Sequence, residues 1–306
     1  MGPTASGKTA LAMEVAAHRP VQLINVDSAQ IYRGMDIGTG KPDTETLKQF
    51  PHELMDILDP TQAYSASDFR SDAITVIQRG LSEGKTPLLV GGTMLYFKVL
   101  RDGIATMPSA DAATRQRILD HAEKEGWSGV HSWLADVDPD AAARIHPNDP
   151  QRLQRALEVY LVSGRTMSEF HRDEQQNGGN DNNLPFNLRF LAIVPEDRGE
   201  LHERIAQRFQ KMLDEGLVDE VRKLHNRGDL EEGLPSIKSV GYRQVWQYLE
   251  GQLDYDQMVE RSIIATRQLA KRQLTWLRSW ENLASLSGLQ AQSTAEVLKY
   301  VDSDAI

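Results

Sequence analysis

Residues 2–9 read GPTASGKT and fill the pattern G-x-x-x-x-G-K-[ST] with Gly2, Gly7, Lys8 and Thr9. In such a loop, backbone N–H groups and the positive end of the following helix converge on an anion. Lys8 adds a mobile full charge, and the Thr9 hydroxyl can ligate Mg²⁺. The pattern therefore predicts a site for a di- or triphosphate, the alternative being a glycine-rich turn with a surface lysine.

Other sequence elements that usually accompany such a loop indicate which reaction it serves. A phosphoryl-transferring enzyme of this type carries a second strand that ends in a metal-holding Asp, but the apolar run TPLLV is followed by Gly91, Gly92 and Thr93. The Asn-Lys-x-Asp element of a GTPase is also absent. The run VQLINVD does end in a carboxylate, Asp27. Ligands of parallel sheets lie at the carboxyl edge, so Asp27 is placed to act beside the phosphate; alternatively, it caps the next turn or holds a metal through water.

Residues 261–280 contain five cationic residues and no acidic residue, although the protein as a whole is acidic. On a helix turning about 100° per residue, the five fall within an arc of about 140°. We call them the basic strip: Arg261, Arg267, Lys271, Arg272 and Arg278. Apolar residues flank the arc on two sides, which suggests a helix wedged between two apolar contacts. Such a strip suits a polyanion in a groove; the alternative is a solvated face balanced by nearby Asp and Glu.

A second cationic stretch is HPNDPQRLQRALEVY. Asp149 is placed to cap a helix and Pro150 to occupy its first turn. Arg152 and Arg155 are three residues apart and share a face. Two guanidinium groups there could reach a diphosphate or a phosphodiester, or they could be ordinary surface arginines.

The surrounding elements alternate between helix and strand. A helix begins at Lys8, the strand VQLINVD follows, a helix with a Ser cap starts near residue 65, and TPLLVGGTMLY gives a buried strand, a turn and a helix. This alternation predicts an α/β fold whose parallel sheet is covered by helices on both faces. Residues 107–185 read as a helical insertion ending in the polar, mobile loop RDEQQNGGNDNNLP. LRFLAIV resumes the sheet, and three helical stretches, a short strand and a helix follow, so residues 1–106 and 186–306 form the core.

Composition sets further bounds. The chain has 306 residues, 40% of them hydrophobic, a formal charge of -10 and no cysteine. Disulfides and cysteine-metal sites are excluded, and a reducing cytoplasm is expected. The sequence has no apolar run long enough for a membrane span. The negative charge disfavours indiscriminate binding to nucleic acid, and we expect a monomer.

Seven ordered motifs resemble those of the bacterial tRNA dimethylallyltransferases (isopentenyltransferases), over essentially the whole chain. They are GPTASGKT, INVDSAQIYRGMDIGTGKP, YSASDFR, LLVGGTMLY, ARIHPNDPQRLQRALEVY, LPSIKSVGYRQVW and TRQLAKRQLTWLR. The resemblance implies a P-loop NTPase-like fold with a helical insertion that contacts tRNA. It implies transfer of a dimethylallyl group from its diphosphate to N6 of the adenosine just 3′ of the anticodon, with Mg²⁺.

The resemblance also implies site residues. Asp27 would be the general base and Thr93 a second catalytic residue, with Thr9 on the metal. The diphosphate would lie on Gly2, Pro3, Thr4, Ala5, Ser6, Gly7, Lys8, Thr9, Arg152 and Arg155. The tRNA anticodon stem-loop would contact Asp27, Ser28, Ala29, Gln30, Thr93, Arg115, Gln151, Arg152, Leu153, Gln154, Arg155, Ile237, Lys238, Ser239, Val240, Gly241, Tyr242, Thr266, Arg267, Gln268, Leu269, Ala270, Lys271, Arg272 and Gln273.

The family carries an apolar strand directly before the loop, so we expect about 5 to 10 further apolar, β-branched residues upstream of Met1. Two other functions compete with prenyl transfer. A small-molecule or nucleotide kinase shares the loop, but the missing strand-end Asp and the acid-free basic helix argue against it. A non-catalytic RNA-binding module would need a vestigial loop, yet the four pattern residues of the loop are intact.

Overall fold

The phosphate loop leads into helix α1 (Lys8–His18), and the chain then enters a parallel sheet of three strands. In the computed structural model, which describes residues 1–105, 107–176, 184–287 and 292–303, the strand order is β2-β1-β3. The central strand β1 (Val21–Val26) pairs in register with β3 (Thr86–Gly91) along its whole length and with the short β2 (His52–Glu53). The segments after β1 and β3 therefore leave the sheet at one edge.

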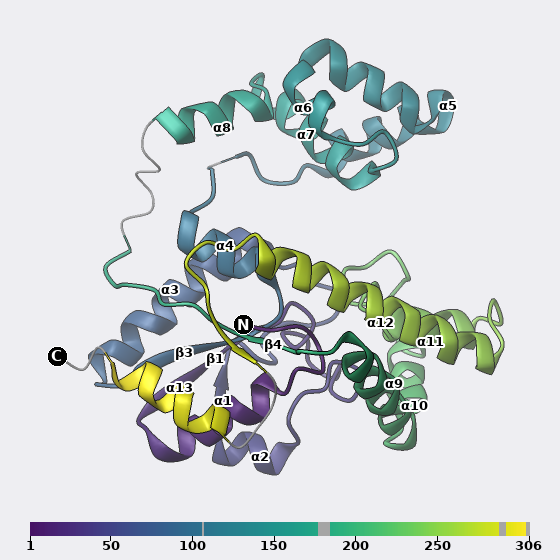
Figure 1. Ribbon diagram of the computed structural model, residues 1–306. Helices are drawn as coiled ribbons and strands as arrows, with labels where there is room; N and C mark the ends of the chain where they lie inside the picture. Colours follow the sequence, from purple (N-terminus) through teal and green to yellow (C-terminus); the bar gives the residue numbers. More distant parts are fainter. Residues whose placement is uncertain (106, 177–183, 288–291, 304–306) are drawn as a thin grey trace. The chain divides into compact units, whose positions relative to one another are not determined.

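Helices cover both faces of this sheet, as the alternation predicted. Helix α1 packs on one face and α3 (Ala66–Ser82) on the other (Figure 1). Ser65 caps α3 in a reciprocal pair with Asp68, which confirms the expected serine cap. Helix α4 (Met94–Asp102) begins two residues after β3, and the short α2 (Thr44–Gln49) lies in the connection between β1 and β2.

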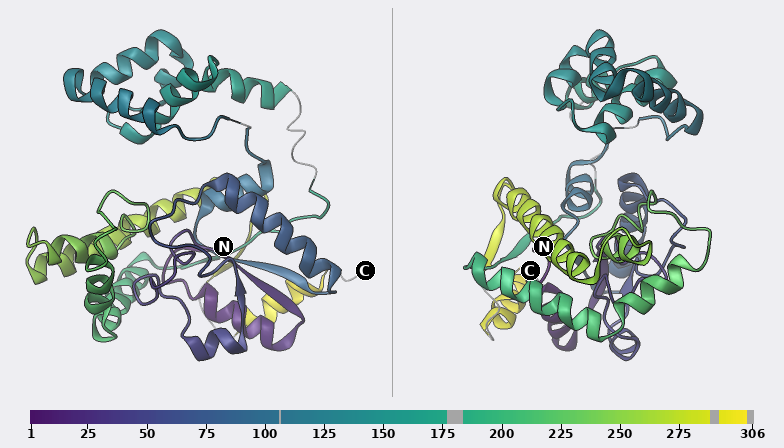
Figure 2. Two further views of the ribbon diagram at one scale, coloured as in Figure 1. Left: turned by 180° about the vertical axis from the view of Figure 1, so that it is seen from behind. Right: turned by 90° about the vertical axis from the view of Figure 1, so that its right-hand side faces the viewer.

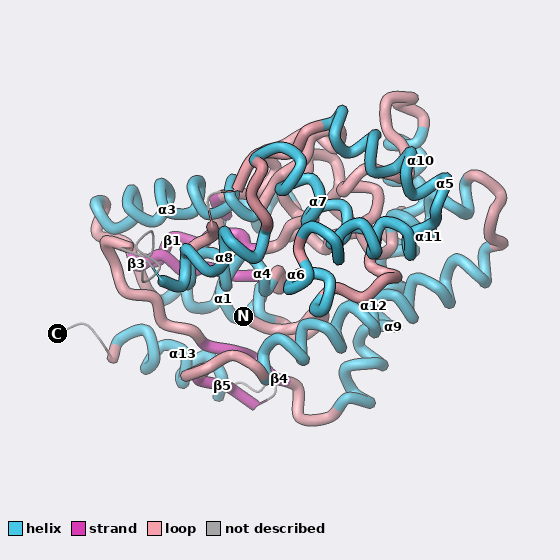
Figure 3. Tube along the Cα trace, turned by 90° about the horizontal axis from the view of Figure 1, so that it is seen from above, coloured by secondary structure: helices cyan, strands magenta, loops and turns pink. Residues whose placement is uncertain are grey.

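Two more strands form a second parallel sheet. Strand β4 (Leu191–Val194) pairs with β5 (Ala284–Ser287), and α13 (Gln292–Asp302) lies beside them against α1 (Figure 3). The expectation that LRFLAIV resumes the first sheet is wrong for the described residues, because β4 bonds to β5 and an apolar groove of about 800 Å³ separates it from β3. The chain enters the phosphate loop alongside β4: the Met1 amine donates to Leu191 O, and Met1 O accepts from Ile193 N. The apolar strand expected upstream stays a prediction.

The segment after β4 is helical: α9 (Arg198–Asp214), α10 (Leu217–His225), α11 (Tyr242–Leu249) and α12 (Tyr255–Arg278), which Figure 2 shows from behind. The sequence pattern suggested one helical stretch where α9 and α10 stand. Gly216 divides them because its φ of 100° is a left-handed conformation that glycine adopts without strain. These helices bury a core around Met35, Phe209 and Trp246.

Residues 102–185 form a separate compact unit, against the predicted boundaries 107–185. It contains α5 (Ala112–Val137), α6 (Pro139–Arg144), α7 (Pro150–Ser163) and α8 (Met167–Gln176), packed around Ile118, Leu134 and Leu157. The Asp149 side chain caps α7 and Pro150 takes its first turn, as predicted. The first part of the polar stretch that we expected to be a mobile loop continues α8, and residues 177–183 lie outside the described residues.

Candidate active site

The phosphate loop is shaped to present backbone N–H groups. Ala5 has a φ of 60° and Gly7 a φ of 75°, so the backbone twice enters the left-handed region. The first bond inside α1 runs from Leu11 N to Gly7 O, which leaves the amides of the first turn without intrahelical acceptors. Such consecutive free amides at a helix N-terminus bind anions.

Lys8 lies within this loop, and its ammonium donates to Pro3 O at 3.2 Å. Burial lowers the pKa of Lys8 to about 8, the Asp27 carboxylate partly opposes this shift, and the Arg208 guanidinium adds to it. A bound polyanion would relieve the cost of burying this charge. The side chain is therefore prepared for a negatively charged ligand.

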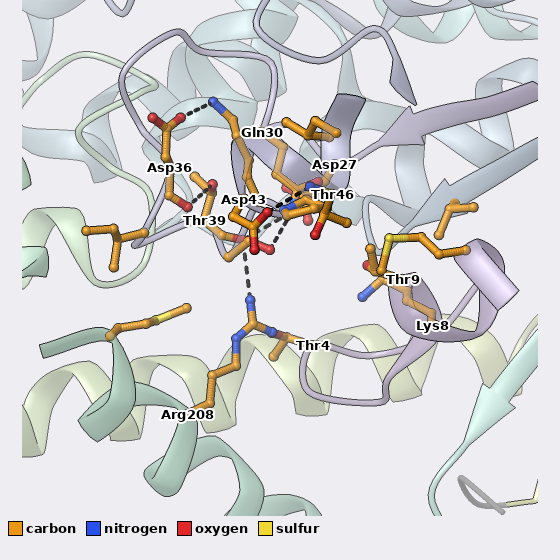
Figure 4. A pocket seen from close by; sticks show the side chains of 18 of the residues that line it. Thr4, Lys8, Thr9, Asp27, Gln30, Asp36, Thr39, Asp43, Thr46 and Arg208 are labelled. Carbon is orange, nitrogen blue, oxygen red and sulfur yellow. Dashed lines mark hydrogen bonds and ion pairs between the residues drawn. The ribbon is translucent and has the colours of Figure 1, made fainter. Parts of the chain in front are cut away.

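Asp27 follows β1, as predicted, and points into the same cavity (Figure 4). Its Oδ1 accepts from Ala29 N at 3.0 Å, and its own N–H donates to Asn25 Oδ1 at 3.2 Å. Asp27 has no ion pair in the described part of the chain, so a carboxylate oxygen is available to accept a proton. Thr93 lies at the end of the neighbouring strand, where its Oγ1 accepts from Ser28 N at 3.0 Å. The Thr93 hydroxyl thus holds the turn that follows Asp27.

Arg208 completes the cluster, although sequence reasoning did not select it. It comes from α9, and its guanidinium donates to Thr4 Oγ1 and to Thr39 O, each at 3.3 Å. Desolvation lowers the pKa of Arg208 while the charge of Asp27 raises it. Within the described residues it has no ion pair, so its charge is directed at the cavity beside the phosphate loop (Figure 4).

Gly40 makes room for this guanidinium. It has a φ of 64°, and a Cβ at this position would lie 1.9 Å from an Arg208 Nη atom. Any other residue would be strained there and would displace the arginine. Gly40, the last residue of the sequence IGTG, is therefore needed for Arg208 to occupy this position.

The cluster opens into a cavity of about 760 Å³. The phosphate loop, Asp27 and Arg208 line it together with further charged residues such as Lys41 and Asp43, and its apolar lining includes Met13, Leu47 and Met212. Asp27 and Arg208 also line a smaller cavity of about 100 Å³. Its other lining residues include the sequence SVGY (residues 239–242) and residues of α12. The carboxylate therefore faces two spaces, one beside the phosphate loop and one beside the motifs expected to contact RNA.

The loop of residues 36–38 is held by a half-buried carboxylate on α10. Glu220 on α10 accepts from the N–H groups of Asp36, Ile37 and Gly38 at 2.8 to 3.1 Å, and from the Tyr242 hydroxyl at 2.5 Å. Burial and the Glu220 charge raise the pKa of Tyr242 well above its usual value. Gln30 also binds this loop, donating to Thr39 O at 3.2 Å. These bonds fix the segment that accepts from Arg208.

The basic strip lies on α12. Arg267 is half-buried and the other four members are exposed, and none of the five has a carboxylate partner among the described residues. The charges of the strip are therefore not neutralised by ion pairs within the described chain, and its assignment to RNA stays a prediction. The helix is packed on one side by Ala270, Leu274 and Leu277, but Trp276 is 37% exposed. On the second side Met258 and Trp280 are buried, so apolar contacts on both sides of the strip are confirmed, with Trp276 the exposed exception.

Cations of the insertion have partners inside their own unit. Glu158 is fully buried and receives bonds from Arg115 at 2.7 Å and Arg155 at 2.7 Å. Burial alone would raise the pKa of Glu158, but these bonds hold it below its ordinary value. Arg152 is exposed and pairs with Asp149 at 3.1 Å. The assignment of Arg152 and Arg155 to a diphosphate, and of Arg115 with Gln151 and Gln154 to tRNA, stays a prediction.

Several residues expected to contact tRNA are inside the protein. The side chains of Leu153, Ile237 and Ala270 are at most 1% exposed, so they pack the fold and do not reach RNA from the surface. Gln273 is buried against the phosphate loop. Lys238, Gln268, Lys271 and Arg272 are exposed, and their assignment stays a prediction.

The described residues contain no group of three or more His, Asp or Glu side chains that could hold a metal ion unaided. Thr9 lines the cavity, as expected of a metal ligand in such a loop. Because Mg²⁺ in such sites takes most of its ligands from phosphates and water, one hydroxyl beside the loop fits it. Among the helices of the described residues, none is both long and apolar enough to traverse a bilayer.

Comparisons with known proteins agree on one relationship. A family model described as IPP transferase matches residues 30–280. The chain is similar to a tRNA isopentenylpyrophosphate transferase from Bacillus halodurans, with 32% identity over 99% of this chain and 94% of that chain and a TM-score of 0.70. A tRNA delta(2)-isopentenylpyrophosphate transferase from Staphylococcus epidermidis shares 33% identity over 99% and 97%, with a TM-score of 0.68. The fold is also similar to that of a eukaryotic dimethylallyltransferase acting on tRNA, at 24% identity over 100% and 79%, with a TM-score of 0.76.

Proposed function

The chain belongs to the IPP transferase family, and from this premise we propose that it transfers a dimethylallyl group from dimethylallyl diphosphate to tRNA. The acceptor is N6 of the adenosine just 3′ of the anticodon, and diphosphate is released. The relatives of known structure are named for prenyl transfer to tRNA. The observation that carries the proposal is the carboxylate of Asp27, which has no ion pair among the described residues and lines the same cavity as the phosphate loop and Arg208.

The chemistry makes three demands. An aryl amine is a weak nucleophile, whereas the allylic carbon loses diphosphate readily because its developing cation is delocalised. In the reaction the C1–O bond to diphosphate breaks, the N6–C1 bond forms and N6 loses one proton. The enzyme has to stabilise the leaving diphosphate, align the amine with C1 and accept that proton.

The phosphate loop, Lys8 and Arg208 meet the first demand. Residues of the phosphate loop and two cations line the same cavity, and preorganised donors of this kind stabilise charge that develops in the transition state. Mg²⁺ held by Thr9 and the diphosphate would supply further positive charge to the leaving group. The apolar side chains of Met13, Leu47 and Met212 line the same cavity and suit the hydrocarbon part of the donor.

Asp27 meets the third demand, because its carboxylate borders both cavities and can accept the N6 proton while C1 lies on the other side. A base stacked in the anticodon loop cannot reach this carboxylate. The adenosine would have to be flipped out of the stack, and the small cavity walled by residues 239–242 suits its entry. The basic strip would bind the RNA phosphates.

The residues that follow strand β3 argue against a kinase reaction. Strand β3 ends in Gly91, followed by Gly92 and Thr93, where a phosphoryl-transferring enzyme carries its metal-holding carboxylate.

We expect the enzyme to work as a cytoplasmic monomer.

The direct test is to incubate the protein with dimethylallyl diphosphate, Mg²⁺ and unmodified tRNA, then search the digested RNA for prenylated adenosine by mass spectrometry. A matched tRNA with guanosine at the target position is the control and should remain unmodified. Formation of ADP from ATP with a small acceptor, in the absence of prenylated adenosine, would contradict the proposal.

A further inference from the structure

The side-chain amide of Gln273 joins three parts of the site. Its Oε1 accepts from Thr4 N in the phosphate loop at 2.8 Å, and its Nε2 donates to Gly92 O, in the turn after β3, at 2.9 Å. Gln273 belongs to α12 and is 7% exposed. A single buried group on the helix of the basic strip therefore bonds both to the phosphate loop and to the turn that follows β3.

The two bonds require a carboxamide. A backbone N–H can only donate and a backbone carbonyl can only accept, so the two partners fix which end of the amide faces each loop. A carboxylate could accept from Thr4 but could not donate to Gly92. A Cβ on Gly92 would lie 2.4 Å from Nε2 and 3.3 Å from Gly2 O, so the glycine leaves the space that the amide occupies.

The bond between Thr4 N and Gln273 lies next to the part of the phosphate loop that has an unfavourable backbone conformation. Thr4 is fixed from two directions, through its N–H by Gln273 and through its hydroxyl by Arg208. The next residue, Ala5, has a φ of 60°, which is unfavourable for a residue with a Cβ and persists only where neighbours impose it. This turn directs the following N–H groups toward the anion site. A loosened Thr4 would let that concave arrangement relax.

We propose that Gln273 is a positioning residue for the phosphate loop, and that it supports the binding of the diphosphate and not the binding of RNA. The inference rests on the proposed function in that the anion is the donor's diphosphate. Through its two bonds Gln273 holds Thr4 in the conformation that binds the anion and holds the turn formed by Gly92 and Thr93.

The test compares Gln273→Met, which keeps the length of the side chain and makes neither bond, with Gln210→Met. Gln210 is an exposed residue of α9 that lines neither cavity. Calorimetry with inorganic pyrophosphate and Mg²⁺ reports on the loop, and filter binding with tRNA reports on the RNA surface. We expect Gln273→Met to weaken pyrophosphate binding about tenfold or more, with tRNA affinity unchanged. Gln210→Met should match the wild type in both assays.

A second variant approaches the amide from its other partner. Gly92→Ala should reproduce the loss of pyrophosphate affinity, because its Cβ displaces Nε2. In a Gln273→Ala background the same change should add little, since the amide is already gone. Additive losses in this cycle would overturn the proposal.

Other outcomes of these measurements also test the proposed role of Gln273. Wild-type pyrophosphate affinity in Gln273→Met would refute the positioning role, and reduced tRNA affinity with a smaller salt dependence would make Gln273 an RNA contact. If the wild-type protein binds pyrophosphate but makes no prenylated adenosine, the proposed function fails while the role of Gln273 in the loop stands.

Discussion

Replacing Asp27 with asparagine separates proton transfer from structure. The asparagine side chain keeps an oxygen that can accept from Ala29 N, a bond of 3.0 Å in the wild type, so the turn after β1 should survive. The variant cannot accept a proton from an aryl amine at neutral pH. The prediction therefore concerns turnover and not folding.

The expected loss follows from the role of the carboxylate. General-base catalysis contributes about 10²- to 10⁴-fold, so kcat should fall by about 10² or more. Asp27 also offsets the positive charges of Lys8 and Arg208. Removing it leaves those cations uncompensated, so affinity for the donor diphosphate should not fall.

Single-turnover formation of prenylated adenosine, with enzyme in excess over tRNA, measures the chemical step. Asp254→Asn is the matched control, because Asp254 caps α12 and asparagine caps a helix equally well. A rate for Asp27→Asn within about threefold of the wild type would show that the base lies elsewhere. A rise in the donor KM with unchanged kcat would instead assign Asp27 to binding.

Three further predictions concern charge. Arg208→Met should lower kcat about 10²- to 10³-fold, as expected for a lost donor to developing negative charge; an effect on tRNA affinity alone would contradict this. Replacing Arg267 and Lys271 by Gln should weaken tRNA binding and reduce the salt slope by about one to two phosphate equivalents, leaving pyrophosphate affinity unchanged; an unaltered slope would show that the strip faces something else. Because the pKa of Lys8 is about 8, its ammonium is charged at pH values well below 8 and half of it is neutral near pH 8, so pyrophosphate affinity should decline as pH rises through about 8. Lys8→Arg should lack this decline, and an identical pH profile would assign it to another group.

Local signals were sufficient for the parts of the site that are close in sequence. The pattern GPTASGKT and the Asp27 that follows β1 needed no long-range information, since the apolar run VQLINV and the parallel order place that residue at the carboxyl edge. The structure confirms both the α/β alternation and the cap at Ser65. The pairing of β4 with β5 depends on segments about 90 residues apart, and short apolar strands do not specify their partners.

Arg208, Glu220 and Gln273 were missed or misassigned for a common reason. Each stands three residues after a buried apolar residue of its own helix, namely Ile205, Leu217 and Ala270. A polar side chain within the apolar stripe of an amphipathic helix faces the interior and needs a partner there. Helical spacing could therefore have identified them as inward-facing, but their partners, Thr4, the 36–38 loop and Gly92, come from distant segments that only the fold brings together.

The unit of residues 102–185 carries its own apolar core. The buried members of that core, from Ile118 to Leu157, all come from within the unit, and Glu158 is balanced by arginines of the same unit. A unit that satisfies its own packing and its own buried charge does not depend on the rest of the chain for its core. Substitutions inside that core should therefore lower the stability of this unit while leaving the packing of the sheet and of its helices unchanged.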